Sequence, residues 1–137
     1  MGKKVDVLTA KSPREIDAVF LALSQSPADA LVVTPDQLLD NRRVQLVTLA
    51  THYRLPTIYA FRENVEIGGL MSYGSSAAER DRQVGIYAGR ILKGERPADL
   101  PVIRAAKFEF VINLQTARVL GVEVPATLLG TADEVIE

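Results

Sequence analysis

The stretch ALVVTPD at residues 30–36 decides the fold class of this chain. Its first five residues form an apolar run without a charge, which is typical of a parallel strand covered on both faces. The dipeptide Pro35-Asp36 then ends the run, because both residues favour turns. We therefore predict that residues 30–34 form a central strand of a parallel sheet.

The segment before this strand carries the start signal of a helix. Ser12 is followed by Pro13 at the first helical position and by Glu15 three residues after the cap, which together form a capping box. The apolar positions that follow share one helical face: Ile16, Val19, Phe20 and Leu23. Ser26-Pro27 ends the predicted helix, and residues 5–9 in front of it are a candidate strand.

Helical and strand-like segments continue to alternate after residue 36. We predict helices over residues 38–53, 76–93 and 113–120, and strands over residues 57–60, 70–73 and 108–112, with residues 61–69 as a connection. The helix over residues 76–93 begins with a capping box at Ser76 and Glu79. We expect its apolar stripe to face inward: Val84, Tyr87, Ala88, Ile91 and Leu92.

This order of elements predicts an α/β fold, an open and mostly parallel sheet with helices on both faces. The chain has 137 residues, of which 47% are hydrophobic, and this is enough apolar material for a single domain over residues 1–137. Within that domain we expect a core over residues 1–70, a returning helix over residues 75–95, and a C-terminal strand and helices over residues 102–137.

The composition argues against several classes of function. A formal net charge of −1 gives no uniform field for a nucleic-acid partner, and the lack of cysteine excludes disulfides and thiolate chemistry. The apolar stretches are shorter than the ~20 residues that a membrane-spanning helix needs. A carboxylate at Asp6 interrupts the apolar run that a signal peptide would require, so we expect no export signal in residues 1–8.

We expect no enzyme activity, no metal and no cofactor. His52 is the single histidine and lies near the end of a predicted helix, which does not favour a metal site. A Ser-His-Asp set could be drawn from Ser72 or Ser75 with His52 and Asp36, but no GxSxG turn marks a nucleophile. Neither a GxGxxG turn nor a GxxxxGK[ST] phosphate loop is present.

Open α/β sheets bind ligands at the carboxyl ends of their strands, so the residues that follow the predicted strands are the candidate site. We predict that six of them bind a small polar or aromatic molecule: Asp36, Phe61, Arg62, Ser72, Tyr73 and Ser75. Phe61 and Tyr73 either stack on a planar ligand or belong to the core. Asp36 either accepts a hydrogen bond from a ligand amine or only ends its strand, and Arg62 either pairs with Glu63 or faces the ligand.

Several motifs carry a family resemblance. They are GGLMSYG at residues 68–74, RILKG at 90–94, PADLPV at 97–102, KFEFVINL at 107–114 and ADEVIE at 132–137. SPREI at residues 12–16 and RLPTIYAFR at residues 54–62 extend the match over almost the whole chain. Together these motifs resemble the ABC transporter substrate-binding protein family, whose better-known members bind tryptophan or tyrosine.

This resemblance implies the type I periplasmic binding fold, in which two α/β lobes hold a small molecule between them. The chain resembles only the C-terminal part of it, which is most of the second lobe and the helix over residues 76–93 that crosses back to the first lobe. The function implied is a solute-binding component, or its C-terminal lobe, that serves an ABC permease outside the cytoplasm and recognises a small molecule such as an aromatic amino acid. The alternative is a cytoplasmic sensor or protein-interaction module without a transport role.

We also expect a homodimer. The apolar stripe of the helix over residues 76–93 faces a lobe that this chain does not include, and a stripe of this kind requires cover. It either folds back onto the chain's own sheet or crosses to a second copy.

Overall fold

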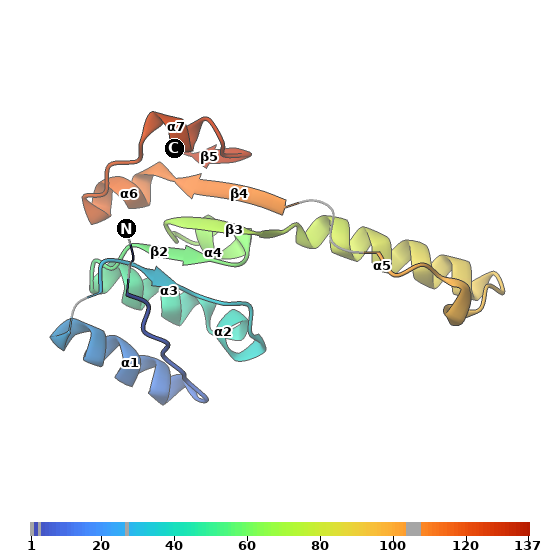
Figure 1. Cartoon of the computed structure of the whole chain (residues 1–137), viewed down its shortest axis with the longest axis horizontal. Coiled ribbons are helices and arrows are strands. Elements are labelled where there is room, and N and C mark those ends of the chain that lie inside the picture. The colour runs from blue at the N-terminus through green and yellow to red at the C-terminus, as the bar shows by residue number, and fades with distance from the viewer. Residues whose placement is uncertain (1, 3, 27, 104–107) are drawn as a thin grey trace.

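The structure is a computed structural model that describes residues 2, 4–26, 28–103 and 108–137. Pro27 and Lys107, which belong to motifs quoted above, lie outside these residues. Figure 1 shows a sheet with helices packed beside it and one long helix that extends away from the rest. In chain order the elements are α1 (Pro13–Gln25), β1 (Leu31–Val32), α2 (Gln37–Asn41), α3 (Arg43–His52), β2 (Thr57–Tyr59), α4 (Arg62–Glu66), β3 (Met71–Ser75), α5 (Ala77–Leu92), the 3₁₀ turn η1 (Pro97–Asp99), β4 (Phe108–Asn113), α6 (Leu114–Leu120), α7 (Ala126–Leu129) and β5 (Glu134–Ile136).

The strands of the described residues form one sheet in the order β1-β2-β3-β4-β5. Strands β1, β2 and β3 run parallel, and β5 runs parallel to β4. The predicted α/β class, an open and mostly parallel sheet with helices, is therefore confirmed. Strands β3 and β4 are antiparallel, with Ser75 opposite Phe108, so β4 begins at the edge of the sheet where β3 ends.

The predicted helix starts depend on local capping, and the structure confirms them. In α1 the hydroxyl oxygen of Ser12 accepts a hydrogen bond from the N–H of Glu15 at 3.3 Å, and the Glu15 carboxylate accepts one from the N–H of Lys11 at 2.9 Å. At α6 the side chain of Asn113 accepts a hydrogen bond from the N–H of Thr116 at 2.9 Å. Gly121 ends α6 in the left-handed conformation, with a φ of 71°, which glycine adopts without a steric penalty.

One face of the sheet carries the core. Ile16 and Phe20 of α1 pack on this face against Tyr59 of β2 and the α3 side chains Leu46, Val47 and Ala50. Further along the same face, the Asn113 side chain of β4 donates a hydrogen bond to the carbonyl of Val65 in α4. The strand register places Tyr59, Ser72 and Val111 side by side on this face, and all three are buried.

The opposite face of the sheet is much less covered. Side chains alternate along a strand, so Val32, Tyr73 and Phe108 lie on this face. Their exposed fractions are 69%, 57% and 52%. The helices are therefore unevenly distributed between the two faces, and an apolar part of the sheet remains open to solvent.

Two strand predictions near the N-terminus are wrong. Residues 30–34 do not form a central strand covered on both faces: β1 spans only Leu31–Val32 and lies at the edge of the sheet. The N–H groups of Leu31 and Val33 both donate to β2 or its flank, so this strand is paired on one side. Residues 5–9 form no strand, and no backbone hydrogen bond between described residues joins them to β1. The apolar composition of residues 30–34 indicated a strand, but it did not indicate which strands would lie beside it.

Two connections also differ from the prediction. The helix expected over residues 38–53 is divided into α2 and α3 at Arg42, whose ψ of 22° departs from helical geometry. The connection expected over residues 61–69 contains the short helix α4. The Asp36 side chain stabilises the start of α2, because it accepts hydrogen bonds from the N–H groups of Leu38 and Leu39.

Helix α5 does not bury its apolar stripe. Figure 1 shows it projecting from the end of β3, with the return segment beside it, and none of its residues is buried. The Tyr87 hydroxyl donates a hydrogen bond to the carbonyl of Pro101, and Arg90 pairs with Glu95 at 2.6 Å. The expectation that this stripe faces inward is therefore wrong, and the stripe does not fold back onto the sheet. We call α5 and its return segment, residues 77–103, the arm. No helix in the described part of the chain is both long and apolar enough to cross a membrane.

Candidate functional site

A cavity of about 390 Å³ lies where β1, β2 and β3 end and β4 begins. Its lining comes from residues 32–35, 58–61 and 73–75, and from Phe108. Parallel strands bring their carboxyl ends to the same edge of a sheet, as expected for a ligand site in an α/β fold. The antiparallel register of β3 and β4 adds Phe108 at the same edge.

Two stacked aromatic rings form one side of this cavity. The rings of Tyr73 and Phe108 are 5.6 Å apart between centroids, with an angle of 16° between their planes. Phe110 meets Tyr73 edge to face at 6.3 Å and 72°. Tyr73 and Phe108 each remain more than half exposed, so a planar apolar ligand can reach them.

Phe61 and Ser75 line the same cavity from neighbouring strand ends. Phe61 has extended backbone geometry directly before α4, and its side chain is half-buried. Ser75 is the last residue of β3 and is also half-buried. Together with Thr34, Ser75 supplies hydroxyl groups to a lining that is otherwise mainly apolar.

Asp36 lies beside this cavity rather than in its lining. One carboxylate oxygen accepts hydrogen bonds from the N–H groups of Leu38 at 2.8 Å and Leu39 at 3.2 Å. The residue also borders a much smaller recess that it shares with Phe61. Asp36 therefore caps α2, and it lies next to the cavity lined by Tyr73 and Phe108, which we call the aromatic cavity.

Arg62 is held in a network of carboxylates. Its guanidinium contacts Glu66 at 2.8 Å, Glu109 at 2.8 Å and Glu134 at 2.9 Å. These contacts raise the pKa of Arg62 above its ordinary value, with the hydrogen bond to Glu66 as the largest cause. Arg62 thus ties α4 to β4 and β5, and it does not line the cavity.

Ser72 lies on the core face and is 1% exposed. Its hydroxyl oxygen has no hydrogen-bond partner among the described residues. Of the six residues predicted from the sequence, the structure brings together Phe61, Tyr73 and Ser75, while Asp36, Arg62 and Ser72 lie elsewhere. Phe108 was missed, because it begins a strand rather than following one, and only the antiparallel register of β4 with β3 brings it here.

The chemistry of the lining favours recognition. Its described residues include no carboxylate, imidazole or cationic side chain. Tyr59 belongs to the lining, but its side chain packs in the core on the other face of the sheet, where burial raises the pKa of the phenol. Among the described residues there is also no cluster of three potential metal ligands from His, Asp or Glu. Aromatic faces with a few hydroxyl groups suit a small molecule that has a planar apolar part.

The chain has an α/β fold with a cavity at the carboxyl ends of its parallel strands. Residues 1–136 match the family model described as ABC transporter substrate binding protein, and the chain belongs to this family. Members of this family are typically non-catalytic components that bind a small-molecule substrate. No curated protein matches the chain in sequence.

Three solved structures resemble the chain. A domain from Streptococcus pneumoniae in complex with L-Trp is 28% identical with a TM-score of 0.82, and the match covers 93% of this chain and 44% of that one. A conserved domain protein from Vibrio cholerae is 24% identical with a TM-score of 0.84, over 93% and 43%. The ligand-free, open structure of a substrate-binding protein with adhesive properties from Clostridium difficile is 25% identical with a TM-score of 0.60, over 93% and 42%. The chain thus spans less than half the length of these proteins.

Proposed function

We propose that this chain is a solute-binding component, or the C-terminal lobe of one, which holds a small molecule for an ABC permease without changing it chemically. The observation that carries this proposal is the aromatic cavity at the strand ends, in a chain of the substrate-binding family. The single domain expected over residues 1–137 then acts as one wall of a binding site.

The proposed ligand is an aromatic amino acid. The stacked pair of Tyr73 and Phe108 offers a flat surface for an aromatic ring, with Phe61 on the neighbouring strand end. Ser75 supplies a hydroxyl group for the polar part of the ligand. The similar domain from Streptococcus pneumoniae was solved with L-Trp, which supports this class of ligand.

The remaining predicted residues receive different roles in this proposal. Asp36 lies at the rim, where its carboxylate can attract the ligand's ammonium group while it caps α2. Arg62 holds the strand ends in place through its ion pairs with three carboxylates. Ser72 supports the end of β3 from the core face, where its side chain is buried. We propose no catalytic role for any of the six.

Binding can be tested with L-tryptophan, L-tyrosine and L-phenylalanine in a thermal-shift titration. A ligand that binds only the folded chain stabilises it by about 2.7 kcal/mol at 100 times its Kd. We expect stabilisation by at least one of these amino acids and its loss in Phe108→Ala. The matched control is Val119→Ala, at a similarly exposed apolar residue on α6. No shift with any of the three would reject the proposed ligand class.

The proposed transport role predicts a particular genomic setting. A gene for this chain that serves a permease should lie near genes for a membrane permease and its ATPase. The second candidate function, a cytoplasmic sensor or interaction module, is favoured by the exposed arm, which offers a surface for a protein partner. A gene without such neighbours, together with ligand binding by the chain, would favour this second candidate.

We also propose that two copies pair through their arms. The arm exposes four large apolar side chains, those of Val84, Ile91, Leu92 and Val102. Burying each of them fully would stabilise a dimer by roughly 1.5–3 kcal/mol. Pairing of arm with arm leaves the cavity open in both copies. Light scattering over a dilution series should show a dimer that Leu92→Asp disrupts and the exposed control Val119→Asp does not. A monomer at every concentration would contradict this pairing.

A further inference from the structure

A small polar recess adjoins the aromatic cavity on the side of α2 and α4. Its volume is about 10 Å³, which is close to the space that one water molecule needs. Asp36 and Asn64 line the recess and do not line the aromatic cavity. The two spaces have four lining residues in common: Val33, Thr34, Ala60 and Phe61. A ligand in the aromatic cavity can therefore extend one small polar group into the recess.

Asn64 is buried, yet its side-chain amide has no hydrogen-bond partner among the described residues. The residue is 4% exposed, and its backbone N–H and carbonyl are both paired, with Phe61 at 3.2 Å and with Gly69 at 2.8 Å. The amide is not sealed off like the hydroxyl of Ser72, because the recess opens beside it. Since a buried amide without a hydrogen bond destabilises a fold, this side chain is suited to pair with a group that enters the recess.

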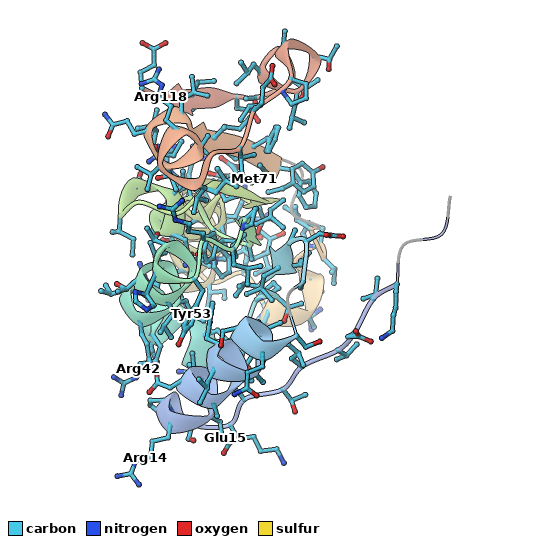
Figure 2. All side chains as sticks on the ribbon, turned by 90° about the vertical axis from the view of Figure 1, so that its left-hand side faces the viewer. Arg14, Glu15, Arg42, Tyr53, Met71 and Arg118 are labelled. Atoms are coloured by element: carbon cyan, nitrogen blue, oxygen red, sulfur yellow. The ribbon has the colours of Figure 1, made fainter. Side chains whose placement is uncertain are left out.

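Backbone contacts hold Asn64 in place. Gly69 approaches α4 so closely that a Cβ at residue 69 would lie 2.6 Å from the carbonyl oxygen of Asn64. Phe61, which accepts the hydrogen bond from the Asn64 N–H, directly precedes α4. Figure 2 shows the side chains crowded together between the sheet and its helices. The recess therefore cannot widen without a shift of α4, and its width limits what can enter.

The polar groups around the recess can accept hydrogen bonds. Asp36 caps α2 with one carboxylate oxygen, and its second oxygen accepts no hydrogen bond from a described residue. Thr34 adds a hydroxyl oxygen, and Asn64 adds its amide oxygen. Asp40 also lines the recess, but Arg43 pairs with it at 3.1 Å. The three remaining oxygens equal in number the three N–H donors of a primary ammonium group.

We propose that the recess binds the ammonium group of the ligand and accepts only a primary amine, with Asn64 as the residue that sets this selectivity. An ammonium group is about as large as a water molecule, so it fits a recess of about 10 Å³. An N-methyl group replaces one donor with a carbon atom and needs more space than the recess has. This inference rests on the proposed aromatic amino acid ligand, whose ring lies against Tyr73 and Phe108.

The test compares three forms of each ligand. L-tryptophan, L-tyrosine and L-phenylalanine are titrated beside their Nα-methyl derivatives and beside the matching 3-arylpropionates, which lack the amine. The shift in Tm gives the affinity of the unaltered chain for each compound. For an amino acid that binds, we expect both analogues to bind about tenfold more weakly, because each loses a charged hydrogen bond in the recess.

Two variants separate the hydrogen bond of Asn64 from its size. Asn64→Leu keeps the branched shape but removes the amide, so it should weaken binding of the amino acid about tenfold and leave the 3-arylpropionate unchanged. Asn64→Ala widens the recess and should bring the affinities for the amino acid and its Nα-methyl derivative within about threefold of each other. The control is Asn41→Leu at the exposed end of α2, which should change neither comparison. Each comparison is between ligands of one protein, so a change in stability alone does not produce these results.

The outcomes distinguish this inference from the proposed function. Equal affinity of the unaltered chain for an amino acid and its Nα-methyl derivative would overturn the inference and leave the proposed ligand class intact. An Asn64→Leu chain that binds the 3-arylpropionate as weakly as the amino acid would also overturn it, because Asn64 would then shape the aromatic cavity rather than bind the amine. No shift with any of the three amino acids would reject the proposed ligand class, and this inference with it.

Discussion

The α-carbon of Gly74 faces the carbonyl of Ala60 so closely that a Cβ at residue 74 would overlap the carbonyl oxygen. This contact brings the end of β3 against the segment after β2, at the aromatic cavity. Gly74→Ala should therefore destabilise the fold by about 1–3 kcal/mol, as overpacking does. Gly85→Ala on α5, where nothing lies within 4 Å, should stabilise its helix by about 0.5–1 kcal/mol. Urea unfolding of both variants measures the difference, and an equal stability would contradict the contact.

Asn113 is a buried cap that joins two helices. It accepts a hydrogen bond from the N–H of Thr116 and donates one to the carbonyl of Val65, and it is 6% exposed. Asn113→Ala should cost about 2–3 kcal/mol, because it removes a cap and leaves buried backbone groups unpaired. Ser12→Ala, at an exposed cap, should cost about 1 kcal/mol. If both variants lowered the free energy of unfolding by the same amount, the hydrogen bond from Asn113 to Val65 would contribute no stability.

Arg62 should contribute more to stability than an isolated surface ion pair, which is worth at most about 1 kcal/mol. It separates three carboxylates that would otherwise repel one another: Glu66, Glu109 and Glu134. Arg62→Met should destabilise the chain, and adding Glu134→Gln to it should recover part of the loss. Unfolding at low and at high salt provides the check, because salt screens the repulsion and should reduce the effect of Arg62→Met. No dependence on salt would contradict the role given to the network.

The end of the arm should be sensitive to acid. The hydrogen bonds from Arg90 lower the pKa of Glu95 below its ordinary value of 4.5. A pKa that is lower in the folded state contributes stability above the unfolded pKa, and this contribution is lost as pH falls through the folded value. An NMR titration of the Glu95 carboxyl should therefore show a midpoint below 4.5, which Arg90→Gln raises. The same midpoint in both proteins would show that the pair does not persist in solution.

The parts of the fold that depend on neighbouring residues in the chain were predictable from the sequence. The caps at Ser12 and Asn113 are examples, since each cap and its partner lie three residues apart. The apolar run at residues 30–34 contains the short strand β1, but the position of β1 at the sheet edge depends on which other strands flank it. The amphipathic pattern of α5 likewise identifies an apolar face without identifying what covers it.

The candidate site, like the fold, was only partly predictable from the sequence. Phe61 follows β2 and Ser75 ends β3, so the general rule for α/β sheets located them. Tyr73 lies within β3, which extends two residues beyond the predicted end of the strand at residue 73. Ser72 was misplaced relative to the cavity, because a shift of one residue along a strand turns a side chain to the other face. Phe108 could not be found by that rule, because β4 runs opposite to β3.

The central claim, that this lobe binds an aromatic amino acid at the aromatic cavity, is tested most directly by the fluorescence anisotropy of L-tryptophan. The chain contains no tryptophan, so the signal at tryptophan's excitation wavelength comes from the ligand. We expect the anisotropy to rise and saturate as the chain is added, and to remain low with Phe108→Ala. An anisotropy that rises equally with Phe108→Ala would contradict the claim. So would an anisotropy that stays at the value of free L-tryptophan, if L-tyrosine and L-phenylalanine also give no thermal shift.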